Sequence, residues 1–149
     1  MKIPVNITIM TNKTVDDPQD GGNRCEVRET TVNGFMHTKK NGLTLEYAEP
    51  EEGSVPVTTL IDLQRSGIVM MNRGGDAGMI FERGKTHSCV FTSGPLRVEI
   101  RVRTEALTNT ISALGGKLDV DYTVDIIASR AEQSHLSLSV RPAQGTTVS

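Results

Sequence analysis

The sequence is built from short runs in which apolar and polar residues alternate, with turn residues between one run and the next. The clearest run, "LRVEIRVRT" at 96–104, has an apolar residue at every second position. Such alternation is typical of a strand with one buried face, whereas a helix repeats its apolar residues about every 3.6 positions. About ten runs of this kind follow one another, and no convincing helix interrupts them. The pattern predicts an antiparallel sandwich or an up-and-down barrel.

Turn residues mark where these strands should reverse. Asn41-Gly42 is the strongest signal, because a type I′ hairpin turn needs positive φ at both central positions. Leu43, Leu45 and Tyr47 alternate directly after it, as a returning strand should. The connection from Glu105 to Gly116, "EALTNTISALGG", is compatible either with a helical turn or two or with the continuation of a long bent strand.

The arginines of the 96–104 run invite a functional interpretation, since three of them lie on one face of the strand. They could read phosphates, but no aromatic residue for stacking on bases lies on the arginine face, and the next run, "KLDVDYTVDIIA", carries aspartates on its polar face. We therefore expect cross-strand ion pairs, in a register in which facing residue numbers have a constant sum. The expected pairs are Arg103–Asp119, Arg101–Asp121 and Arg97–Asp125.

Size and charge limit the possible functions further. The chain has 149 residues, the size of a single domain, with 16 basic and 18 acidic residues and a net charge of −2. This balance gives no general attraction to nucleic acid or to an anionic membrane. The N-terminus lacks the apolar run of a signal peptide, and no apolar run is long enough for a transmembrane helix. With only two cysteines, a cytoplasmic protein with reduced thiols is the expectation.

Several residues of types that can act in catalysis or in metal or phosphate binding have a plainer structural explanation. His37, His87 and His135 lie on three different predicted strands without the spacing of a metal site. His87 and Cys89 share one face of a strand, but a nucleophile and its base two residues apart in a strand rarely reach hydrogen-bonding geometry, so Cys89 is expected to be a small core residue. The glycines of "NRGGDAG" at 72–78 lack the Lys-Ser/Thr ending of a phosphate loop and predict a tight turn. We accordingly expect no enzyme, no metal and no cofactor.

Taken as strands in order, the chain resembles the YwiB-like family of uncharacterised bacterial proteins. The resemblance rests on the stretches "GFMHTKKNGLTLEY", "VMMNRGGDAGMIFERGKTHSCVFTSGPLRVEIRVRT" and "GGKLDVDYTV". It implies a calycin-like, lipocalin-type fold, an antiparallel up-and-down barrel of about 8–10 strands. The resemblance extends from about Val5 to Arg141, and we expect one domain over residues 1–141 followed by a flexible tail, "PAQGTTVS", over 142–149. The family has no established activity, so the resemblance implies no catalytic or binding residues.

A barrel of this size either packs solid or holds one small ligand. The first hypothesis is therefore non-enzymatic binding of a small apolar or amphipathic molecule in the barrel interior, with Arg73 as an anchor for a carboxylate or phosphate head. The alternative is a solid barrel that acts through a protein partner or as a homodimer. A cavity of roughly 300 Å³ or more favours the first hypothesis. The candidate ligand-binding residues are Tyr47, Arg73, Met79, Phe81 and Tyr122.

Overall fold

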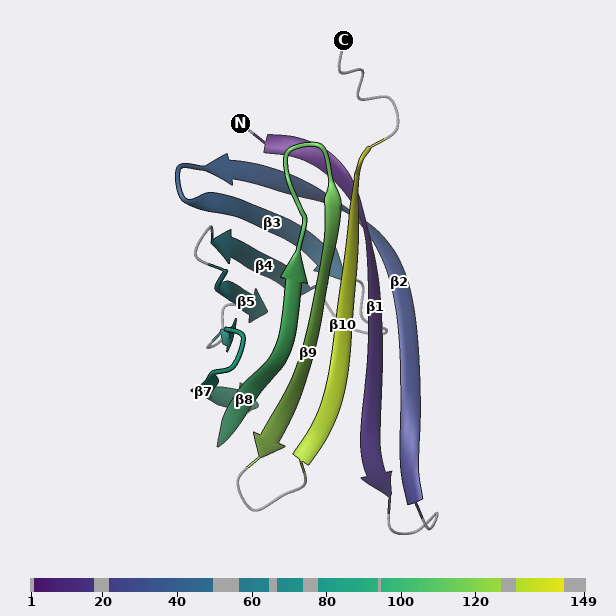
Figure 1. The fold of residues 1–149 in the computed structure, drawn as a ribbon, viewed down its shortest axis with the longest axis vertical. Coiled ribbons are helices and arrows are strands. Elements are labelled where there is room, and N and C mark those ends of the chain that lie inside the picture. Colours follow the sequence, from purple (N-terminus) through teal and green to yellow (C-terminus); the bar gives the residue numbers. More distant parts are fainter. Residues whose placement is uncertain are drawn as a thin grey trace.

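A computed structural model describes residues 2–17, 22–49, 57–64, 67–73, 78–93, 95–126 and 131–143. Its regular structure within these residues is entirely β, as the alternating sequence predicts (Figure 1). The strands are β1 (Lys2–Asp17), β2 (Gly22–Lys39), β3 (Gly42–Glu49), β4 (Val57–Gln64), β5 (Val69–Arg73), β6 (Met79–Phe81), β7 (Thr86–Ser93), β8 (Leu96–Asn109), β9 (Gly116–Ile126) and β10 (Ala131–Pro142).

The strands form one antiparallel sheet that curls into a nearly closed barrel. Their order in the sheet is β6-β5-β4-β3-β2-β1-β10-β9-β8-β7, so every hydrogen-bonded neighbour is also a neighbour in sequence, except that the first strand pairs with the last. The seam of the barrel therefore lies between β6 and β7. It is closed at one end, where the backbone N–H of Gly84 donates to the carbonyl of Thr104 at 2.9 Å and the N–H of Thr104 donates to the carbonyl of Lys85 at 3.1 Å. The predicted up-and-down barrel is confirmed.

The apolar face of each strand lines the barrel interior. Branched aliphatic residues dominate this core, because the chain has no Trp and few other aromatics. The largest fully buried side chains are Phe81, Ile7, Met36, Leu45, Ile61, Leu118, Leu138, Val5, Val69, Val102 and Val120. Removing this apolar surface from water is the main stabilising contribution to the fold.

Strand β2 belongs to both walls of the barrel. It pairs with β1 from Gly22 to His37 but with β3 only from Gly34 to Lys39, so its first half continues along β1 without β3 beside it (Figure 1). Gly34 lies where the two walls diverge, and a Cβ added there would meet the carbonyl oxygen of Glu46 at 2.5 Å and the Cβ of Tyr47 at 3.0 Å. The close approach of the two strands at this point therefore requires glycine.

The predicted pairing of β8 with β9 is confirmed, but the predicted register is wrong. Arg101 lies opposite Asp125, Arg103 lies opposite Thr123, and a bulge follows Thr104. The predicted register would centre the turn on Ile111, whose side chain is buried. The chain instead turns between Ser112 and Gly115, and burial and turn geometry outweigh surface ion pairs of a few tenths of a kcal/mol.

Three of the charges expected to form these pairs, Arg103, Asp119 and Asp121, contact other side chains. Arg103 contacts Glu105 of its own strand at 3.2 Å. The imidazole of His135 on β10 lies between two β9 carboxylates, with Nδ1 2.5 Å from Asp121 and Nε2 3.4 Å from Asp119. Arg101 and Arg103 do face away from the core, as predicted, since both side chains are exposed.

Two turns differ in detail from their sequence signals. The β2–β3 hairpin is present, but Lys39 pairs with Gly42, so Lys40 and Asn41 form its two-residue loop and Gly42 begins the next strand. Of the two alternatives for 105–116, the long strand is the one observed: β8 runs to Asn109 and contains no helical turn. Residues 74–77, the middle of the turn predicted from "NRGGDAG", lie outside the described residues, as does most of the expected tail, 144–149. The described part of the chain has no helix of the length and apolarity needed to cross a membrane.

Candidate functional site

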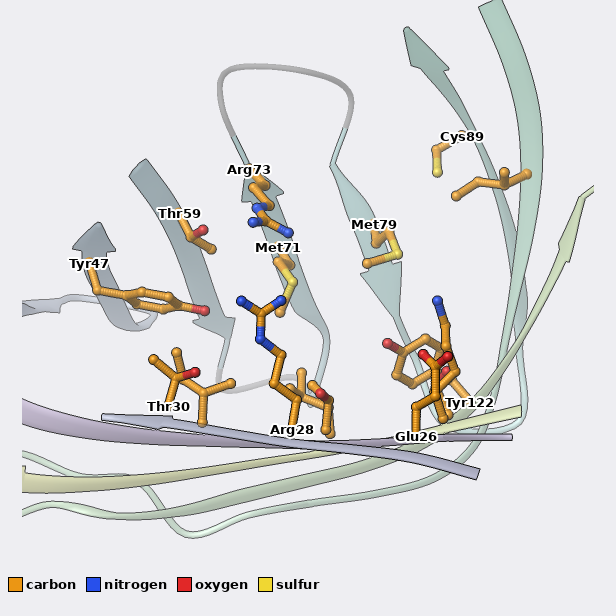
Figure 2. A pocket seen from close by; sticks show the side chains of 16 residues that line it. Glu26, Arg28, Thr30, Tyr47, Thr59, Met71, Arg73, Met79, Cys89 and Tyr122 are labelled. Carbon is orange, nitrogen blue, oxygen red and sulfur yellow. The ribbon is translucent and has the colours of Figure 1, made fainter. Parts of the chain in front are cut away.

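A cavity of about 460 Å³ opens between the two walls of the barrel. It lies where the first half of β2 leaves β3, so the long strands form one wall and the short strands β3 to β6 face them. Its lining mixes aliphatic, hydroxyl-bearing and charged side chains (Figure 2). The lining residues are Ile9, Thr11, Lys13, Glu26, Arg28, Thr30, Tyr47, Thr59, Met71, Arg73, Met79, Cys89, Ile100, Tyr122, Ser134 and Leu136.

One wall presents a row of three polar side chains on neighbouring strands. Tyr47 on β3 lies opposite Thr59 on β4, and Thr59 lies opposite Arg73 on β5. Directly opposed side chains on one face of an antiparallel sheet lie about 5 Å apart at Cβ, so the phenol, hydroxyl and guanidinium reach one region of the cavity. Figure 2 shows all three directed into it.

The facing wall supplies a second arginine. Arg28 on β2 lies opposite Thr11 on β1, which in turn lies opposite Leu136 on β10. In Figure 2 the guanidinium of Arg28 points across the cavity toward that of Arg73. Both arginine side chains are exposed, which places them at the mouth rather than on the floor of the cavity.

Thr59 carries an unsatisfied hydroxyl inside the site. Its residue is 1% exposed, and its Oγ1 has no hydrogen-bond partner in the described structure. A buried hydroxyl without a partner costs about 1–3 kcal/mol. A group that enters the cavity and hydrogen-bonds to Thr59 would recover part of this free energy.

Tyr122 on β9 lines the cavity and contacts Phe81 and Ser134. Its ring packs against Phe81 with centroids 4.8 Å apart at an interplanar angle of 58°. Burial raises the pKa of the Tyr122 phenol above its ordinary value of 10.0, and a hydrogen bond with Ser134 acts in the opposite direction. The phenol is therefore neutral at physiological pH, available for hydrogen bonding but not for charge pairing.

Cys89 also lines the cavity, but its environment is the reverse of that of a catalytic thiol. Burial raises its pKa above the ordinary value of 9.0, whereas an activated nucleophile needs a lowered one. His87 shares the inner face, as predicted, and its Nε2 lies 3.0 Å from Oε1 of Glu82. No group of three or more potential metal-ligating side chains occurs among the described residues.

The structure brings together four of the five residues predicted for the site. Tyr47, Arg73, Met79 and Tyr122 all line the cavity. Phe81 does not line it, because its side chain is fully buried and supports Tyr122 from below.

Sequence reasoning missed the polar residues of β1 and β2 that face the cavity. Val27 is the apolar residue of "CEVRET", so a simple reading turns it inward, yet it is 64% exposed. Glu26 and Arg28 take the inward positions instead. The alternation of the strand was the signal that could have found them. Side chains two residues apart in a strand share a face, so Glu26 and Arg28 lie on the same face as the buried Val32 and Met36.

Comparisons with known proteins agree with this architecture. The sequence profile of a domain of unknown function, DUF1934, matches residues 7–138. The chain belongs to the DUF1934 family. A crystal structure of the YwiB protein from Bacillus subtilis superposes with a TM-score of 0.79 over 96% of this chain and 94% of that one, at 17% sequence identity. A search of curated proteins found no match. The resemblance to YwiB-like proteins is thus confirmed, and DUF1934 membership gives the chain a family without assigning it an activity.

Proposed function

We propose that this protein binds a small apolar or amphipathic molecule in the mouth of its barrel and does not transform it chemically. The observation that carries the proposal is the cavity of about 460 Å³ between the two walls. Ligand sites in proteins are typically concave, roughly 300–1,000 Å³ in volume, and largely apolar with a few polar groups. The size and mixed lining of this cavity match that description.

The chemistry of the lining supports binding more than catalysis. Burial raises the pKa of the Cys89 thiol, which disfavours the reactive thiolate, and His87 contacts Glu82. The aliphatic side chains of Met71, Met79 and Leu136 offer contact area without reactive groups. The two cysteines are free thiols, as is usual in the reducing cytoplasm. The proposal is therefore of a calycin-like binding protein in the cytoplasm.

The alternative, a solid barrel that acts through a partner or as a homodimer, is less well supported because the interior is not filled at its mouth. Large apolar side chains do occur on the outer surface, among them Phe35 and Leu60, which are 46% and 43% exposed. Single exposed apolar residues are common on monomeric proteins, however.

The two adjacent methionines of β5 provide the test. Met71 lines the cavity, while Met70 is on the outer face and 38% exposed. We expect the small neutral dye 1-aminoanthracene to bind saturably to the purified protein, Met71→Trp to weaken binding by narrowing the cavity, and Met70→Trp to leave binding intact. Circular dichroism checks that both variants fold. Absence of saturable binding, or equal loss in both variants, would refute the proposal.

A further inference from the structure

We propose that the ligand carries an anionic oxygen head group, a carboxylate or a phosphate, and that Arg28 and Arg73 hold this group between them at the mouth of the cavity. The inference rests on the proposed function and adds the chemical class of the ligand. It follows from the arrangement of charge, hydroxyl groups and apolar surface around the cavity.

The two guanidinium groups approach one region from opposite walls. Arg73 comes from β5 and Arg28 from β2, strands that are not hydrogen-bonded to each other. Their side chains point toward one another across the opening (Figure 2). An anion placed between the two guanidinium groups would be attracted to both. Guanidinium groups suit this role because their planar donors match the oxygens of carboxylate and phosphate.

The lining contains two further charged side chains, Lys13 and Glu26. Lys13 forms an ion pair with Glu132 at 3.0 Å. Glu26, the acidic residue of the lining, lies two residues before Arg28 on the same face of β2. In the lining, basic side chains outnumber acidic ones by three to one, which favours an anionic ligand.

Two hydroxyl groups adjoin the arginines and add the hydrogen bonds that an anion requires. Thr59 is the direct cross-strand neighbour of Arg73, and its buried Oγ1 has no partner in the described structure. The phenol of Tyr47 is next in the same row. An oxygen-bearing head group at this position can accept hydrogen bonds from the guanidiniums and from Thr59.

The size of the cavity limits the rest of the ligand. At about 30 Å³ for each water-sized group, a volume of about 460 Å³ holds about 15 non-hydrogen atoms. Met71, Met79 and Leu136 supply apolar surface beyond the arginines. A medium-chain amphiphile fits this space, with its head at the exposed arginines and its tail inside.

The test compares ligands that share one tail and differ in the head group. Binding of decanoate, decyl phosphate, decanol and decylammonium is measured by displacement of 1-aminoanthracene at neutral pH. We expect one or both anions to bind at least about tenfold more tightly than decanol, the factor given by one charge-assisted hydrogen bond. We expect decylammonium to bind more weakly than decanol. The stronger anion identifies the head group as carboxylate or phosphate.

Variants locate the head group. Arg28→Met or Arg73→Met should remove the preference for the anion, while decanol binding stays within about twofold. Arg101→Met is the matched control, since Arg101 is exposed on the outer face of β8, and it should retain the preference. Equal binding of decanol and both anions would overturn the inference but leave the proposed function standing. Failure of all four ligands to displace the dye, or of the dye to bind, would overturn both.

Discussion

Replacing Gly34 with alanine tests the junction at which the two walls of the barrel separate. The backbone of Gly34 is outside the left-handed region, so an alanine is conformationally allowed and would by itself stabilise the protein by about 0.4–1 kcal/mol. Its Cβ, however, would lie 2.5 Å from the carbonyl oxygen of Glu46, where ordinary contact begins at 3.4 Å. The two strands would have to separate by about 0.9 Å in a packed region, at a cost of about 1–3 kcal/mol.

The steric cost outweighs the entropic gain, so we expect Gly34→Ala to lower the free energy of unfolding by about 1–2 kcal/mol and the melting temperature by about 2–8 °C. Urea unfolding followed by circular dichroism measures this directly, since the chain has no Trp to report by fluorescence. Asn33→Ala, one residue earlier on the exposed face, is the control and should change stability by less than about 0.5 kcal/mol. An alanine variant as stable as the wild type, or more stable, would refute the close approach at Gly34.

Two further predictions concern the outer wall and the inner side of the cavity. A double-mutant cycle on His135 and Asp121 should give a coupling free energy of about 0.2–1 kcal/mol, which is typical of exposed pairs. A cycle on Arg101 and Asp121 should give none, because the register separates these residues by about 13 Å along the sheet. The opposite result would support the register expected from charge matching. The raised pKa of Tyr122 means that the folded state keeps its phenolic proton at pH values where the unfolded chain has lost it, so stability should fall as the pH rises above about 10. Tyr122→Phe should flatten this part of the stability profile in urea unfolding, and an unchanged slope would count against burial of the phenol.

The sequence predicted the barrel well because alternation and burial are local signals. Val102 and Val120, for example, alternate with charged residues in the sequence and are fully buried in the structure. The register of β8 against β9 was not predictable from charge, because an exposed ion pair contributes less than the position of the turn and its buried neighbour Ile111.

The site was only half predictable for a related physical reason. Arg73 and Tyr47 continue the inward phase of clearly apolar strands, so pattern alone directs them into the barrel. At the mouth the usual polarity is reversed, with Val27 outside and Arg28 inside, and a rule that turns apolar residues inward fails there. The convergence of Arg28 and Arg73 also depends on how the two walls separate, which no single strand encodes.

The two cysteines allow the most direct measurement of whether a ligand occupies the barrel. Cys89 on β7 lines the cavity, and Cys25 is exposed on the outer face of β2. Cys89 therefore reports on the inside of the barrel and Cys25 on the outside. Alkylation is followed at about pH 9, because burial raises the pKa of Cys89 and only thiolate reacts. We predict that saturating decanoate slows alkylation of Cys89 at least about tenfold, as mass action requires when most sites are filled, and leaves the rate at Cys25 unchanged. An unchanged rate at Cys89, or an equal change at both cysteines, would contradict binding inside the barrel.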